Sequence, residues 1–290
     1  MSVWEAVFLG ALQGATEFFP VSSSGHLVVG QTLLVLEIPG VQFEVAVHVA
    51  TLVSVLAIYR VRLIELLYGT LRRDGDAWRY VGLLALATLP AGIVGVFFRD
   101  AIEVLFESPF VPATAFLVMG AILWSTRRVL RREGEQELGR GFGRELGQGF
   151  QYEPGPELGR EDWKKPGWGV ALLIGLAQAF ALVPGISRSG TTVAMALWLG
   201  VDAEEAAEFS FLMAIPAIGG AALLQMPDLA SQGLTLSGTA LAAGSIVAAI
   251  TGILAIKAFV VLLTRKTFHR FAIYCWALGL GFLLYLFTIA

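Results

Sequence analysis

Long apolar runs dominate the chain, and their lengths predict its secondary structure. A helix needs about 20 residues, within a range of roughly 17–25, to cross the hydrocarbon core of a bilayer. The apolar segments fall at about 3–19, 23–36, 43–59, 80–98, 110–126, 168–183, 191–201, 207–226, 236–263 and 271–289. Six of them reach the crossing length, and the other four are short or interrupted and occur as two neighbouring pairs. The pattern predicts an all-α polytopic membrane protein.

Each short pair of segments surrounds a polar stretch. The first stretch, from Gly10 to Leu27, places Gln13 and Glu17 on one helix face before Pro20 interrupts the helix. The second stretch runs from Gly175 to Thr192. Broken helices at membrane depth are tolerated only where protein or a water-filled cavity satisfies the freed backbone groups. We therefore expect each stretch to be a re-entrant helix pair.

The two polar stretches also resemble each other. A shift of 165 positions aligns five identical pairs: Gly10 with Gly175, Gln13 with Gln178, Ser22 with Ser187, Ser24 with Ser189 and Gly25 with Gly190. Each half then holds one re-entrant pair and three crossings. Because three is an odd number of crossings, the second half enters the membrane from the opposite side and is inverted relative to the first. The sequence predicts inverted repeats over 1–127 and 167–290, joined by a linker over 128–166, with the broken helices meeting near the membrane midplane.

The basic residues give an independent prediction of topology. Seventeen of the 20 Lys and Arg residues fall in three places: 60–79, 127–165 and 265–270. With six crossings these three segments share one side, which the positive-inside rule makes cytoplasmic. Both termini are then expected outside. The glycine-rich repeats within 134–165 are typical of a flexible linker; they lack the Lys-Ser/Thr that follows a phosphate-binding glycine loop.

Composition supports the membrane assignment. Hydrophobic residues make up 56% of the 290 residues, against roughly 45–50% in soluble domains. The net charge of -3 averages over a polarised chain, so it points to no nucleic-acid partner, and we expect membrane lipids as the surroundings. The only cysteine, Cys275, excludes an intramolecular disulfide and a cysteine metal cluster. Whether the protein is a homo-oligomer stays open.

The polar stretches combine groups that suit a phosphate. Arg188 lies inside a re-entrant break, where a charge is by default a functional-site hypothesis. A guanidinium fork, clustered hydroxyls and helix N-termini bind phosphate groups. Glu17 and His26 add a carboxylate and an imidazole that could make the site reactive. His48, in a full span, is expected to pack or hydrogen-bond between helices; Glu44 suits an interfacial position and a cavity equally well.

Three motifs carry a resemblance to a known family. They are the [E/Q]-x-x-x-E pattern at Gln13 and Glu17, the P-V-S-S-S-G-H run from Pro20 to His26, and the P-G-x-S-R-S-G-x-T run from Pro184 to Thr192. In these motifs, and across essentially its whole length, the sequence resembles the undecaprenyl-diphosphate phosphatase family, also called the bacitracin-resistance family. The resemblance implies a multi-pass enzyme of the bacterial plasma (inner) membrane with its active site facing the periplasm or exterior. It also implies hydrolysis of a polyprenyl diphosphate to the monophosphate carrier lipid of cell-wall synthesis, with a divalent cation, Mg²⁺ or Ca²⁺.

Carried over residue by residue, the family's motifs give a set of expected roles. Substrate binding is expected of Gln13, Ser22, Ser24, Ser187, Ser189 and Thr192, and catalysis of His26, Glu17, Ser23 and Arg188. His26 is the first choice for the nucleophile or for the base that activates Ser23, and Ser23 itself is the second. Glu17 is the expected metal ligand, although Gln13 in place of a second carboxylate weakens a two-carboxylate site. The alternative function is a lipid-phosphate transporter or flippase that uses the same midplane site.

Overall fold

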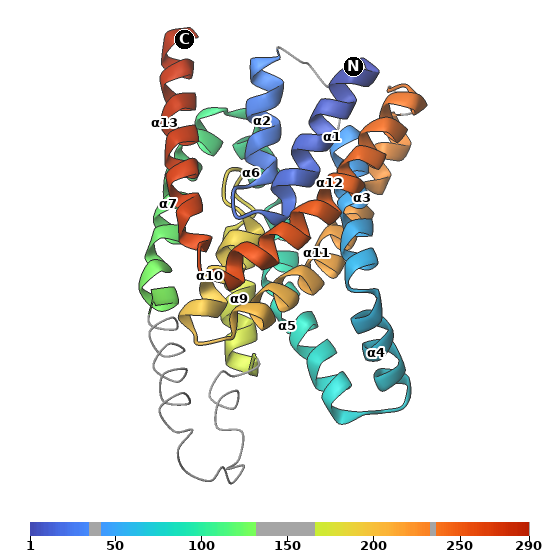
Figure 1. Ribbon diagram of the computed structural model, residues 1–290. Coiled ribbons are helices and arrows are strands. Elements are labelled where there is room, and N and C mark those ends of the chain that lie inside the picture. Colours follow the sequence, from blue (N-terminus) through green and yellow to red (C-terminus); the bar gives the residue numbers. More distant parts are fainter. Residues whose placement is uncertain (35–41, 132–165, 233–235, 290) are drawn as a thin grey trace.

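The computed structural model describes residues 1–34, 42–131, 166–232 and 236–289, and helices are the only regular elements in these ranges (Figure 1). The first half contains α1 Val3–Phe18, α2 Ser23–Leu33, α3 Gln42–Ile58, α4 Arg60–Leu71, α5 Gly75–Phe97, α6 Arg99–Glu107 and α7 Phe110–Ser125. The second half contains α9 Trp168–Phe180, α10 Arg188–Trp198, α11 Ala203–Gln232, α12 Gly238–Thr264, the 3-10 helix η1 Phe268–Arg270 and α13 Phe271–Ile289. The all-α prediction is confirmed.

Five helices in the described ranges are long and apolar enough to cross a membrane: α5, α7 with its continuation to Arg131, α11, α12 and α13. A sixth candidate is the pair α3 and α4, which passes the same test together but bends by 76° at its break. The predicted multi-pass membrane protein is therefore confirmed. Helix α3 alone has 17 residues, because the charged residues from Arg60 onward turn the chain away from the line of the span.

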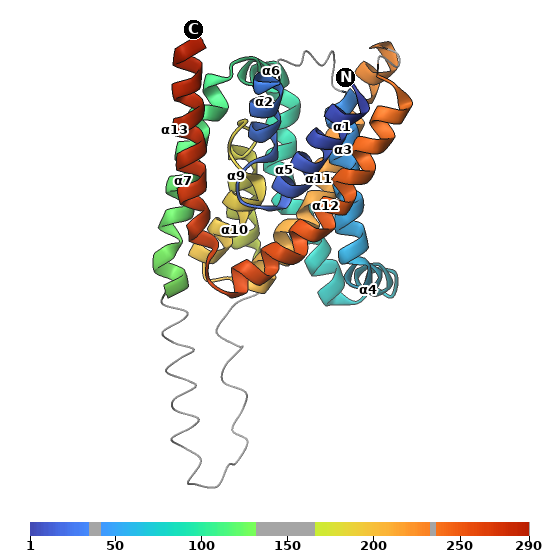
Figure 2. The same cartoon turned by 45° about the horizontal axis from the view of Figure 1, so that its top comes forward.

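Two helices were not predicted from the sequence. Helix α4 carries several charges, and α6 is a nine-residue amphipathic helix without a buried residue. Both are too short or too polar to register as apolar spans. Helix α6 lies at the end of the bundle that also carries both chain termini, whereas α4 lies at the opposite end (Figures 1 and 2). The common side of the termini agrees with the predicted topology.

The helices of the two halves pack in a reciprocal pattern. Helix α1 packs along α12 and α9 along α5, while α7 pairs with α13 and α3 with α11. Helix α1 starts at the end with the termini, and α9 starts at the other end (Figure 1). This is the pattern expected of inverted halves, although pairing alone leaves the inverted symmetry and the boundaries 1–127, 128–166 and 167–290 as predictions. Most of the linker, 132–165, lies outside the described residues.

Two aligned glycines allow the short helices to pack closely. A Cβ on Gly10 would collide with the backbone carbonyl of Gly244 in α12, and a Cβ on Gly175 would lie 2.6 Å from the carbonyl oxygen of Ala87 in α5. Membrane helices associate through such small-residue contacts because lipid supplies no hydrophobic drive between them. Equivalent positions of the repeat thus seat α1 and α9 on their partner helices.

This contact gives a stability prediction. Gly10→Ala should lower the free energy of unfolding by about 1–3 kcal/mol, because the added methyl group forces α1 away from backbone atoms that cannot move aside. The matched control is Gly92→Ala in α5, where a Cβ meets nothing within 4 Å. Thermal denaturation in detergent should show a lower Tm for Gly10→Ala alone. Equal Tm values for the two variants would contradict the close packing of α1 on α12.

Candidate active site

The first polar stretch breaks into a turn between α1 and α2. Helix α1 ends at Phe18, and the side chain of Ser22 caps α2 by accepting a hydrogen bond from the amide of Gly25. Ser22 has a φ of 65°, which is uncommon for a residue with a side chain and carries local strain. The N-terminus of α2, with its positive dipole, is buried in the bundle, since Ser22 and Ser23 are 3% and 8% exposed.

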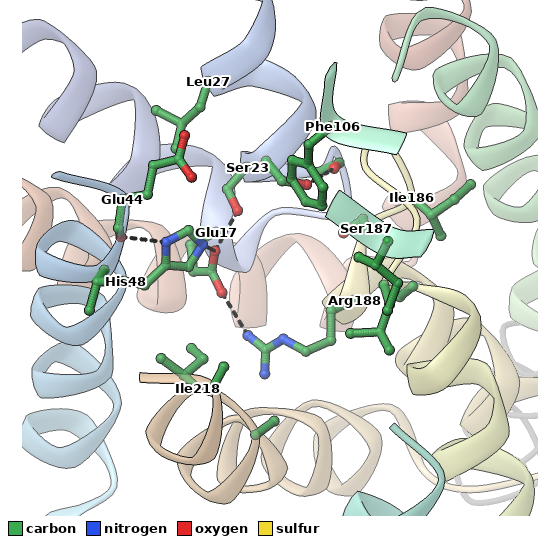
Figure 3. Close-up of a pocket in the computed structure, with 18 of the residues that line it drawn as sticks. Glu17, Ser23, Leu27, Glu44, His48, Phe106, Ile186, Ser187, Arg188 and Ile218 are labelled. Atoms are coloured by element: carbon green, nitrogen blue, oxygen red, sulfur yellow. Dashed lines mark hydrogen bonds and ion pairs between the residues drawn. The ribbon is translucent and has the colours of Figure 1, made fainter. Parts of the chain in front are cut away.

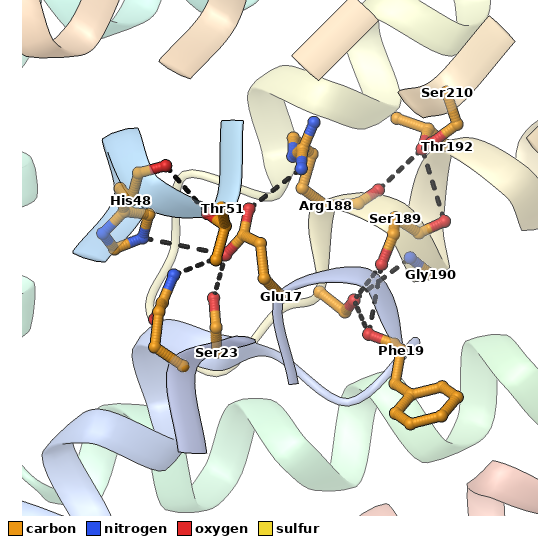
Figure 4. Close-up of polar contacts among 12 residues, drawn as sticks. Glu17, Phe19, Ser23, His48, Thr51, Arg188, Ser189, Gly190, Thr192 and Ser210 are labelled. Atoms are coloured by element: carbon orange, nitrogen blue, oxygen red, sulfur yellow. Dashed lines mark hydrogen bonds and ion pairs between the residues drawn. The ribbon is translucent and has the colours of Figure 1, made fainter. Parts of the chain in front are cut away.

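The second stretch forms a similar break between α9 and α10. Gly185, at a φ of +95°, reverses the chain, and Ser187 caps α10 by accepting from the amide of Gly190. The hydroxyls of Ser187 and Ser189 donate to the carbonyl oxygen of Phe19 at 3.3 and 3.1 Å (Figure 4). The second break thereby adds two donors to a backbone carbonyl of the first break, which also accepts a hydrogen bond from the amide of Val21.

Glu17 links the two breaks. Its Oε1 accepts a hydrogen bond from Nη2 of Arg188 at 2.9 Å, across the junction between α1 and α10. Its Oε2 accepts from Nε2 of Gln13 at 2.9 Å and from the hydroxyl of Ser23 (Figure 4). Glu17 is only 8% exposed. The carboxylate is therefore held in place by donors from both polar stretches, as the prediction that they meet requires.

A cavity of about 320 Å³ opens beside this carboxylate (Figure 3). Its polar end is lined by Glu17, Ser22, Ser23, Ser24, Glu44, His48, Ser187 and Arg188. Its remaining lining is largely apolar and comes mainly from α2, α6, α11 and the segment between α9 and α10, including Leu27, Ile102, Phe106, Ile186 and Ile218. Nη1 of Arg188 is buried and has no hydrogen-bond partner among the described residues. The cavity thus combines a cationic side chain that is only partly paired with an apolar wall, which suits an anionic group attached to an apolar chain.

Four of the residues that the sequence singled out lie behind the cavity wall instead of in it: Gln13, His26, Ser189 and Thr192. Gln13 and Ser189 position Glu17 and the first break, as described above. Thr192 is fully buried, and its hydroxyl bonds with the carbonyl of Arg188 at 2.7 Å and the hydroxyl of Ser210 at 2.6 Å. These contacts fix the start of α10 under the guanidinium.

His26 is also turned away from the cavity. Its Nδ1 lies 2.7 Å from the carbonyl oxygen of Ser22, and its Nε2 lies 2.7 Å from the hydroxyl of Tyr274. The imidazole stacks on the ring of Tyr274 and is 4% exposed. Both ring nitrogens are occupied, so this geometry supports His26 as a brace between α2 and α13 and gives no support to its expected role as nucleophile or base.

Sequence comparison identifies the family. The family model described as bacitracin resistance protein BacA matches residues 6–281 of the chain. The chain belongs to the bacitracin resistance protein family. A protein from Alcanivorax borkumensis named undecaprenyl-diphosphatase is 38% identical over 293 residues, covering 99% of this chain and 100% of that protein. Proteins of the same name from Desulfatibacillum aliphaticivorans and Rubrobacter xylanophilus are 37% and 36% identical, covering 95% and 96% of this chain and the same shares of their own lengths.

This family member carries one cavity residue whose position the sequence did not predict. His48 was interpreted as a packing residue between helices, yet its side chain is 31% exposed and lines the cavity beside Glu17 (Figure 3). Glu44, left open between interface and cavity, lines the cavity as well. The signal was present in the sequence, because Glu44 and His48 repeat the i,i+4 spacing of Gln13 and Glu17 within an apolar helix.

The donor set does not fit a metal held by the protein alone. Among the described residues no three His, Cys, Asp or Glu side chains come together closely enough to hold an ion. Both oxygens of Glu17 already accept hydrogen bonds from Gln13, Ser23 and Arg188. The role of Glu17 as metal ligand and the dependence on a divalent cation therefore stay predictions.

The hydrogen bond between Thr192 and Ser210 gives a prediction about stability, because neither residue lines the cavity. Thr192→Val leaves the Ser210 hydroxyl without its partner and should cost about 1–3 kcal/mol of stability, whereas Thr192→Val combined with Ser210→Ala should recover part of that loss. Thermal denaturation of wild type, both single variants and the double variant measures the coupling. Additive losses would show that the hydroxyls do not depend on each other.

Proposed function

We propose that this protein is an undecaprenyl-diphosphatase that hydrolyses a polyprenyl diphosphate to the monophosphate and inorganic phosphate. The observation that carries the proposal is the guanidinium of Arg188, a residue that lines the cavity: its Nη2 donates a hydrogen bond to Glu17, and its buried Nη1 has no partner among the described residues. A buried, unsatisfied cationic donor is costly unless a ligand pairs with it, and phosphate is the ligand that a guanidinium fork matches best. The curated names of the relatives support the same substrate.

The cavity suits the head of such a lipid better than its whole length. Its volume of about 320 Å³ lies at the lower end of the range for small-molecule pockets. The diphosphate occupies the end with Ser24, Ser187 and Arg188, and the first isoprene units lie against Phe106 and Ile218. The rest of the chain extends into the lipid, because apolar residues of α6 and α11 form that side of the cavity.

The contacts of Glu17 support Ser23 as the nucleophile of the first step. The Ser23 hydroxyl already donates its proton to Oε2 of Glu17, so the carboxylate can accept this proton as Oγ attacks the terminal phosphorus. A phosphorus–oxygen bond forms to Ser23 while the bridging oxygen leaves with the polyprenyl monophosphate. Arg188 stabilises the charge on the transferring phosphoryl group. Ser23 thus replaces His26 as the first choice of nucleophile.

A divalent cation would bind here chiefly through the diphosphate. Mg²⁺ commonly keeps several waters and takes one or two carboxylates together with substrate phosphates. Glu44 is the cavity carboxylate with the fewest contacts, since its Oε1 accepts one long hydrogen bond, 3.3 Å, from Nε2 of Gln31. In that arrangement Glu44 would hold the ion together with the diphosphate, and the ion would supply positive charge that offsets the charge of the substrate.

The proposed location is the bacterial plasma membrane with the active site facing the exterior. The orientation rests on two observations: α6, which lines the cavity, lies at the end with both termini, and the basic segments predict that end to be outside. Release of the monophosphate on that face would make it available as a carrier lipid. The transporter alternative gains no support from the relatives, whose name is that of a phosphatase.

The test is phosphate release from undecaprenyl or farnesyl diphosphate by the purified protein in detergent. Arg188→Ala should lower kcat/KM by about 100-fold or more, because the charge on the transferring group loses its main partner, and Arg188→Lys should recover only part of it. An added chelator should abolish release if the cation is required. A folded wild type that releases no phosphate with any divalent ion would contradict the proposed function.

A further inference from the structure

The three histidines of this protein all lie in described residues and occupy very different surroundings. His26 has both ring nitrogens engaged behind the cavity. His269, in η1, packs edge-on against Trp124 and does not line the cavity. His48 alone among them lines the cavity. An imidazole that reaches this site therefore comes from α3, outside the two polar stretches that carry the family motifs.

The tautomer of His48 follows from its backbone contact. Nδ1 lies 2.7 Å from the carbonyl oxygen of Glu44, one helical turn earlier (Figure 3). A carbonyl oxygen only accepts hydrogen bonds, so Nδ1 carries the hydrogen and donates it. In the neutral ring, Nε2 is then the nitrogen with the free lone pair. The helix backbone thus aims the basic nitrogen of His48 into the cavity.

That nitrogen lies beside the catalytic carboxylate without bonding to it. Nε2 of His48 is 3.8 Å from Oε2 of Glu17, beyond hydrogen-bond distance. The same Oε2 accepts the hydroxyl of Ser23. Nε2 is therefore free to accept a hydrogen bond from a water molecule on the cavity side of the ring, beside Glu17. A water in this position lies next to Ser23, whose oxygen carries the phosphoryl group after the first step.

We propose that His48 is the general base of the second half-reaction, an inference that rests on the proposed function. Nε2 of His48 takes a proton from water as the water oxygen attacks the phosphorus of phospho-Ser23. The bond between phosphorus and Oγ of Ser23 breaks, and Oγ takes back the proton that Glu17 accepted in the first step. Inorganic phosphate leaves with the oxygen from water, and His48 then returns its proton to the solvent.

The two half-reactions need two proton acceptors, and both Glu17 and His48 line the cavity. Glu17 is bonded to Ser23 and can carry that one proton in both directions, but it remains protonated while the phosphoenzyme exists. A protonated carboxyl cannot also serve as base for the water. A second base must therefore reach the cavity, and His48 is placed to do so.

The experiment compares His48→Ala with the matched control His269→Ala, using polyprenyl diphosphate labelled in its terminal phosphate. Phosphate release should fall by about 100- to 10 000-fold in His48→Ala and stay at the wild-type rate in His269→Ala. Acid-quenched His48→Ala should accumulate label as phosphoserine at Ser23, approaching one per protein, and Ser23→Ala combined with His48→Ala should show none. Free imidazole added to His48→Ala should speed phosphate release and discharge the phosphoserine.

The outcomes separate the failure of this inference from the failure of the proposed function. Wild-type turnover in His48→Ala overturns the role of His48 and leaves the phosphatase intact. Slow release by folded His48→Ala without phosphoserine also overturns the role of His48. The step that the variant slows would then come before the phosphoserine forms, or the reaction would not pass through phosphoserine. Absence of phosphate release from wild-type protein contradicts the phosphatase itself. A Tm of His48→Ala equal to that of wild type shows that the variant is folded.

Discussion

The buried contact between Glu17 and Arg188 is the interaction on which the rest of the site depends. It joins α1 of one half to α10 of the other at a depth where neither charge could stand alone. An ion pair in such a place is stable only if further hydrogen bonds satisfy the remaining atoms. Gln13 and Ser23 do this for the carboxylate, whereas Nη1 of Arg188 is buried and has no hydrogen-bond partner among the described residues.

The broken helices are the structural means of placing this pair. A continuous helix would satisfy its own backbone and expose no amide to a ligand, whereas each break presents a helix N-terminus and a row of serines. The carbonyl of Phe19, in the first break, accepts hydrogen bonds from two serines of the second, which ties the breaks together. Close packing at Gly10 and Gly175 holds α1 against α12 and α9 against α5. The two polar stretches therefore determine both how the two halves pack and which side chains meet at the site.

Much of this arrangement could be predicted from the sequence, and the failures share one cause. Helical spans, both breaks and the meeting of Glu17 with Arg188 follow from apolar run length, from proline and serine clusters, and from the cost of an intramembrane charge. The similarity between the two polar stretches is also visible in the sequence. The sequence does not indicate the rotation of a helix about its axis. His26, inside a motif, was expected at the substrate but faces Tyr274, whereas His48, outside the motifs, faces Glu17.

Helices α4 and α6 show a second limit of prediction from the sequence. Apolar run length detects helices long enough to cross the membrane, and it overlooks short helices that carry charged residues, such as α4 and α6. Yet Phe106 of α6 forms part of the cavity wall, so an element that the pattern missed contributes to the site.

The most direct test of the account is a double-mutant cycle on the pair at its centre. Glu17→Gln, Arg188→Gln and the double variant are compared with wild type by their free energy of unfolding in detergent. Each single change should cost about 3–5 kcal/mol, because it leaves a buried charge without a partner. The double variant should be more stable than the sum predicts by about 0.5–3 kcal/mol. Losses that add to within about 0.5 kcal/mol would contradict the claim that this ion pair holds the two halves of the site together.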